Sequence, residues 1–152
     1  MTDTYDKSVR TMAEECVAVR LRLLTRAVTR IYNVALRPYG INISQLNVLA
    51  AVAYLGEARQ QKVCQVLHMH KSTLSRDLIR MQHVGWIRSQ GGQDGREVLL
   101  RVTSAGKALL AKAFPAWNEA QEEAKTLLGE KDIMSLGRSV LSLRSKSADR
   151  SK

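Results

Sequence analysis

The chain has 152 residues, of which 24 are Lys or Arg and 14 are Asp or Glu, so its formal net charge is +10. Hydrophobic residues (45%) and charged residues (25%) stand in globular proportions, which excludes wholesale disorder and fibrous structure and predicts one domain with its own core. Aromatic residues are only 5% and Pro occurs only 2 times, so the composition favours helices over a β-sandwich. No apolar run is long enough for a membrane span, and the polar N-terminal segment does not resemble a signal peptide. The two cysteines are too few for a disulfide scaffold, so a reducing cytoplasm is the expected compartment.

The N-terminal part of the chain predicts two helices. Residues 10–37 read as one long helix, because apolar residues recur every three or four positions and no Gly or Pro interrupts them. Pro38 and Gly40 end this helix. Ser44 is expected to cap a second helix, which stops at Gly56.

The middle of the chain predicts two short helices and a hairpin. The helices cover residues 60–68 and 71–84, with only a few residues between them. Strand-like runs at 85–89 and 98–102 flank a segment with Gly-Gly and Asp-Gly pairs, which favour the positive backbone angles of a tight turn. Three short helices followed by such a hairpin are typical of a winged helix-turn-helix.

The C-terminal part predicts two more helices. The first covers residues 104–128, is capped by Thr103 or Ser104 and is bent by Pro115. The second covers residues 131–145. The long helices at both ends of the chain are apolar over more length than one small domain can cover, which predicts that they pack on a second copy of the chain.

These elements predict a mainly α-helical fold with a small β-hairpin wing, built as a single domain over residues 1–152. We expect residues 44–102 to form a winged helix-turn-helix lobe that binds DNA. The segments 10–37 and 104–145 are expected to form the homodimer.

The helix predicted at 71–84 has a pattern suited to a DNA major groove. Leu74, Leu78 and Met81 face inward by their spacing. The outward residues are small hydroxyls and arginines, which can bond to bases and phosphates: Ser72, Thr73, Ser75, Arg76 and Arg80. The alternative interpretation of the same residues is an ordinary solvated helix face.

The hairpin tip adds a second contact of the same kind. Arg96 follows Asp94 and Gly95, so Asp94 can hold the guanidinium in a direction that enters a narrow minor groove. The alternative is a surface turn with no function. Helix and tip together favour DNA binding, with a non-specific structural DNA-binding protein and a protein-interaction module as competing hypotheses.

The sequence resembles the MarR (multiple antibiotic resistance regulator) family along nearly its whole length. The matching stretches are Tyr32–Ile41, Lys71–Arg76, Gly85–Ile87, Asp94–Arg96 and Val102–Gly106. The resemblance implies a homodimeric winged-helix transcriptional regulator that binds roughly palindromic double-stranded DNA, most often a repressor released by a small-molecule or oxidant effector. It places Ser72, Thr73, Ser75 and Arg76 where the recognition helix meets DNA.

The same resemblance places Arg96 at the position of the wing arginine. With Lys71, Arg80 and Asp94 these residues make up the predicted DNA-binding set. Two features differ from many relatives: His70 stands where an Asp often begins the recognition helix, and the wing is shorter.

Cys16 is a candidate redox sensor, because peroxide-sensing members of the family carry a reactive Cys in this neighbourhood. Arg20, one helical turn away, is expected to supply the positive charge that stabilises a thiolate. The alternative is a small side chain packed on an apolar face. Cys64 is expected in the core.

No metal site and no catalytic site are predicted. His68 and His70 lie two residues apart without further ligands, so no metal is expected, and Asp77 and Glu97 are interpreted as surface ion-pair partners. The sequence contains no phosphate-binding loop, no dinucleotide fingerprint and no nucleophile elbow, so neither a cofactor nor an enzymatic activity is expected. The resemblance to the MarR family also implies an effector pocket between the long helices and the lobe, for which Arg20, Tyr32 and Trp117 are candidate lining residues. The alternative for Trp117 is an ordinary core position.

Overall fold

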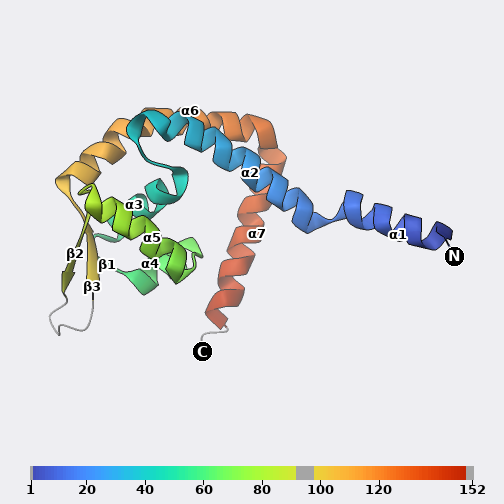
Figure 1. Ribbon diagram of the computed structural model, residues 1–152, viewed down its shortest axis with the longest axis horizontal. Helices are drawn as coiled ribbons and strands as arrows, with labels where there is room; N and C mark the ends of the chain where they lie inside the picture. The colour runs from blue at the N-terminus through green and yellow to red at the C-terminus, as the bar shows by residue number, and fades with distance from the viewer. Residues whose placement is uncertain (1, 92–97, 150–152) are drawn as a thin grey trace.

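The computed structural model describes residues 2–91 and 98–149, which are mostly helical with one small sheet (Figure 1). The elements in chain order are α1 (Thr2–Glu15), α2 (Val17–Leu36), the short 3-10 helix η1 (Arg37–Tyr39), α3 (Ile43–Leu55), β1 (Ala58–Arg59), α4 (Gln60–Leu67), α5 (Lys71–His83), β2 (Ile87–Gly91), β3 (Val98–Val102), α6 (Ser104–Leu128) and α7 (Glu130–Asp149). This order confirms the predicted fold class, a mainly α-helical winged helix-turn-helix with a small β wing. In the described residues no helix combines the length and the hydropathy that a membrane crossing requires.

The central part of the chain, from α3 to β3, folds into a compact lobe. Helices α3, α4 and α5 pack on an antiparallel sheet of strand order β1-β3-β2. β2 and β3 pair from Ile87 opposite Val102 to Gly91 opposite Val98. The core of the lobe holds fully buried aliphatic and sulfur-containing side chains: Leu36, Val48, Leu49, Val52, Val63, Leu74, Met81 and Leu100.

The first helix differs from the prediction. Residues 10–37 are not one helix, because Cys16 has an extended backbone (φ −61°, ψ 111°) that separates α1 from α2. An arginine stabilises the break: Arg20 Nη2 donates a hydrogen bond to the Glu14 carbonyl at 2.8 Å, so a carbonyl left open at the end of α1 has a partner. Helix α1 consequently projects away from the rest of the chain (Figure 1).

The cap of α3 also differs from the prediction. Asn42, and not Ser44, caps this helix: the Gln45 N–H donates to Asn42 Oδ1 at 2.9 Å, and the Asn42 N–H donates to Gln45 Oε1 at 3.3 Å. This capping box leaves the hydroxyl of Ser44 free to donate to Asp77 Oδ2 of α5 at 2.8 Å. Asp77, interpreted from the sequence as a surface ion-pair partner, instead joins α5 to α3.

The long helices lie together beside the lobe. Helix α2 packs along α6, which arches over the lobe as expected for a helix that contains Pro115 (Figure 1). Thr103 caps α6 as predicted, since its Oγ1 accepts the Gly106 N–H at 3.1 Å. Helix α7 runs to Asp149 and is thus longer than the predicted 131–145.

Candidate nucleic-acid interface

Helices α4 and α5 form a helix-turn-helix with a tight turn. His68 ends α4 in the left-handed conformation (φ 51°, ψ 42°), and it is the one described non-glycine residue with a positive φ. His70 is the N-cap residue that precedes α5, and its side chain makes no capping hydrogen bond to the helix, in line with the absence of an Asp at this position. The turn is therefore formed by the backbone conformation of His68. At the N-terminus of α5, the side chain of the N-cap residue accepts no hydrogen bond from the first backbone N–H groups.

Helix α5 has one buried and one exposed side. Leu74, Leu78 and Met81 are buried in the lobe, as predicted from their spacing. The predicted DNA-binding residues of this helix lie on the other side, where all are exposed except the half-buried Ser75: Lys71, Ser72, Thr73, Ser75, Arg76 and Arg80.

The charge of the exposed side is uniformly positive. Asp77 is the sole acidic residue of α5, and its carboxylate is turned toward α3 by the hydrogen bond from Ser44. Arg76 lies along the helix in this structure, with its Nε donating to the Ser72 carbonyl at 3.3 Å. Its terminal guanidinium nitrogens remain available for a phosphate or a guanine.

Polar contacts fix the wing strands relative to α5. The side-chain amide of Gln82, near the end of α5, donates to the hydroxyl of Ser89 on β2. Arg101 on β3 forms an ion pair with Glu57, which directly precedes β1. The described part of the wing is thus attached both to the helix-turn-helix and to the turn after α3.

A close contact joins the lobe to α6. Thr103 Oγ1 donates to the Gly85 carbonyl at 2.6 Å, while the Thr103 N–H donates to the Trp86 carbonyl at 3.0 Å. A Cβ on Gly106 would lie 2.3 Å from the Trp86 oxygen and 2.7 Å from Val102 Cγ1. Only glycine allows this approach, so the residue explains how the first turn of α6 lies directly on the sheet.

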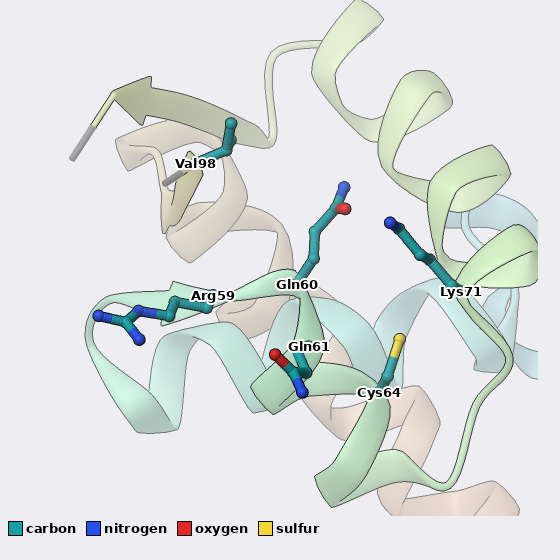
Figure 2. A pocket seen from close by; sticks show the side chains of 6 residues that line it. All are labelled: Arg59, Gln60, Gln61, Cys64, Lys71 and Val98. Atoms are coloured by element: carbon teal, nitrogen blue, oxygen red, sulfur yellow. The ribbon is translucent and has the colours of Figure 1, made fainter. Parts of the chain in front are cut away.

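A cleft of about 540 Å³ opens beside the N-terminus of α5. Its lining comes from β1, α4, α5 and β3: Arg59, Gln60, Gln61, Cys64, Lys71 and Val98. Figure 2 shows that the side chains of Gln60, Cys64 and Lys71 point toward the hollow, whereas Arg59 extends away from it. The sequence did not indicate the residues around β1, because a strand of two residues has no periodic pattern. Cys64, expected in the core, packs against it but is only partly buried.

The remaining predicted residues have mixed outcomes. Asp94 and Arg96, predicted at the wing tip, lie outside the described residues, as does Glu97. Cys16 is partly exposed at the break between α1 and α2, and the Arg20 side chain bonds to the Glu14 carbonyl. The described residues contain no group of three His, Cys, Asp or Glu side chains that could hold a metal ion.

The structure brings together two of the three residues predicted for an effector pocket. The rings of Tyr32 and Trp117 lie 6.3 Å apart between α2 and α6, and the Tyr32 hydroxyl donates to the Gln121 side chain. Burial raises the pKa of Tyr32, and the positive charge of Lys125 partly opposes this. Arg20 lies three turns earlier on α2 and does not join this cluster.

Comparisons with known proteins place this geometry in context. No protein-family model matches the chain. The helix-turn-helix (HTH)-type transcriptional regulator YwoH of Bacillus subtilis is 30% identical over 78 residues, which are 51% of this chain and 57% of that relative. The chain thus matches little more than half the length of this relative.

Solved structures match most of the chain. A mutant of MarR from E. coli, complexed with operator DNA, superposes with a TM-score of 0.77 at 18% identity and covers 88% of this chain and 96% of its own. The M. tuberculosis regulator MosR, in complex with DNA, has a TM-score of 0.75 at 27% identity and covers 88% and 97%. A probable transcriptional regulator from Pseudomonas aeruginosa has a TM-score of 0.77 at 20% identity and covers 86% and 98%. These neighbours confirm the resemblance predicted from the sequence motifs: the chain has the fold of the MarR-family regulators.

Proposed function

We propose that the chain is a homodimeric transcriptional regulator that binds a specific, roughly palindromic DNA duplex through α5. One observation carries this proposal: α5 presents small hydroxyls and three cations outward, while its sole carboxylate is turned inward to α3. A helix with this surface suits the major groove, because cations contact phosphates and Arg bonds to the edge of guanine. The two structural neighbours solved with DNA support the same assignment.

The homodimer is supported by an apolar seam on α2. Six residues at alternating steps of four and three form it: Val17, Leu21, Leu24, Val28, Ile31 and Ala35. The second half of the seam is half-buried where α2 packs on α6, whereas the first half is exposed, with Leu24 at 42% and Val17 at 66%. A second copy of the chain is the natural cover for this continuation, since α7 has an exposed apolar side too, with Leu136, Val140 and Leu143.

The proposal can be tested by selection from a randomised duplex pool, followed by affinity measurements at one near-physiological salt concentration. We expect a preference of about a thousandfold or more for the selected duplex over a scrambled one. Arg76→Ala should weaken binding to the selected duplex, while Lys112→Ala, an exposed cation on α6, serves as the control of equal charge change. Equal binding to both duplexes would support the non-specific hypothesis, and no binding at moderate salt would support a protein-interaction module.

The wing prediction is tested in the same assay. We expect Arg96→Ala to weaken binding and to reduce the salt dependence of the affinity by about one unit in slope, because one phosphate-neutralising cation is removed. An unchanged affinity and an unchanged salt dependence would show that the wing does not contact the DNA.

We further propose that the regulator is a repressor and that an effector releases it by changing the spacing of the two lobes in the dimer. The two candidate triggers are a small molecule near Tyr32 and Trp117 and oxidation of Cys16. Peroxide treatment of the DNA complex tests the second, with Cys16→Ser as the matched control. Release of the wild type and retention of the variant would support sensing by Cys16, and release of both would exclude it.

A further inference from the structure

The exposed side of α5 contains one large apolar residue, Ile79. Its side chain is 67% exposed, whereas Leu74, Leu78 and Met81 on the same helix are at most 2% exposed. Ile79 follows Ser75 by four residues, so it lies on the face of the helix that carries the proposed DNA contacts. The sequence pattern did not indicate Ile79, because the spacing that marks the buried face of the helix does not include this position.

The free chain gains little from isoleucine at this position. Its side chain is β-branched and has a lower helix propensity than Ala, Lys or Glu, which are favoured at exposed helix positions. It also buries little apolar surface, since two thirds of it remains exposed. An apolar group at the centre of a polar, cationic face is therefore better explained by what the face contacts.

The major groove of DNA offers one apolar group at its edge, the C5-methyl group of thymine. Ile79 lies three residues after Arg76, or about 4.5 Å along the helix axis. Successive base pairs are about 3.4 Å apart. If α5 occupies the groove, the methyl groups within reach of Ile79 lie about one to two base pairs from the base that Arg76 contacts.

We propose that Ile79 determines part of the DNA sequence specificity, by packing on the C5-methyl group of one thymine in each half-site. This inference rests on the proposed function, because it requires that α5 enters the major groove. The contact removes apolar surface of both partners from water, so it stabilises the complex only where the methyl group is present.

The test is removal of the methyl group from the DNA alone. In the duplex selected by the wild type, each thymine is replaced in turn by deoxyuridine, which keeps the base pair and lacks the methyl group. We expect one substitution per half-site to weaken wild-type binding by about fourfold, the equivalent of one buried methyl group. With Ile79→Ala the same substitution should have no effect, and Ile79→Val should retain part of the wild-type response.

Thr73→Ser is the matched competitor variant, because Thr73 is exposed on the same helix and also carries a methyl group. A deoxyuridine effect that persists in Ile79→Ala and disappears in Thr73→Ser would overturn the inference. Specific binding without any deoxyuridine effect would overturn it as well, while leaving the proposed function intact. Absence of specific binding in the wild type would overturn both. Circular dichroism checks the fold of the variants, and their exposed positions predict no change.

Discussion

The lobe and the long helices of this chain differ in how completely a single copy of the chain buries their apolar residues. The lobe encloses its apolar residues, so that Leu49, Leu74 and Leu100 are fully buried in a single chain. The long helices leave theirs open: Leu21, Leu24 and Leu141 are all more than two fifths exposed. The core of the lobe, which includes Leu36 of α2, is therefore complete within one chain, whereas the outer part of the long helices leaves apolar surface for the proposed second copy. Under the proposed function, this division separates the DNA contact from the dimer that positions it.

The largest difference between the two regions should appear when the same substitution is made in each. We expect Leu74→Ala to lower the free energy of unfolding by about 2–5 kcal/mol, because it leaves a cavity in the lobe. Leu23→Ala on α2, where the side chain is 59% exposed, should change it by less than about 0.5 kcal/mol in dilute, monomeric protein. Urea denaturation measures the free energy of unfolding of both variants. Equal losses would contradict the claim that the lobe buries its apolar residues within one chain and the long helices do not.

The second prediction concerns the apolar seam. We expect Leu24→Asp to raise the dissociation constant of the dimer by about a hundredfold or more, because an unpaired carboxylate would be buried between copies. Tyr54→Asp on α3, where the side chain is 92% exposed, is the control and should leave the dimer unchanged. Sedimentation equilibrium distinguishes them. A seam variant that dimerises like the wild type would show that the partner binds elsewhere.

The third prediction concerns the junction of the two regions at Gly106. Gly106→Ala should lower the free energy of unfolding by about 1–3 kcal/mol, since the added methyl group would overlap the backbone of Trp86 and force α6 away from the sheet. Gly137→Ala in α7 is the matched control, because no atom outside its own stretch of helix lies within 4 Å of the position that a Cβ would occupy. It should instead raise stability by up to about 1 kcal/mol through helix propensity. A loss of similar size in both variants would mean that the close approach is not the cause.

Most of the fold could be predicted from the sequence, because its elements are long and periodic. The inward face of α5 follows directly from a spacing of 3.6 residues, and β3 has the bounds predicted for it, whereas β2 begins two residues later than the predicted 85–89. Strand β1 could not be predicted, since its two residues pair with Leu99 and Leu100, which are distant in sequence. The break at Cys16 was missed for a related reason: neither Gly nor Pro marks it, and a side chain from the following helix stabilises it.

The residue types on the exposed face of the candidate site could be predicted from the sequence, whereas the hydrogen bonds that hold its helices together could not. The hydroxyls and arginines of α5 lie outward as predicted, and whether they contact DNA remains a prediction. Asn42 and Ser44 were both suited to cap the helix. Asn42 is the cap, and the Ser44 hydroxyl bonds instead to Asp77 on α5. Local sequence cannot decide such competition, because Ser44 and its partner Asp77 are 33 residues apart.

The smallest predicted effect lies in the turn of the helix-turn-helix. His68 adopts a left-handed backbone, which costs a residue with a Cβ about 1–2 kcal/mol, while glycine avoids this cost and loses about 0.5–1 kcal/mol of chain entropy. We therefore expect His68→Gly to raise the free energy of unfolding by up to about 1 kcal/mol, whereas His68→Ala, which keeps the Cβ, should leave it within about 0.5 kcal/mol of the wild type. Urea denaturation resolves this difference. Since the backbone of the turn is retained, DNA affinity should be unchanged in both variants, and a stabilised variant with weakened binding would instead reveal that the imidazole of His68 contacts DNA.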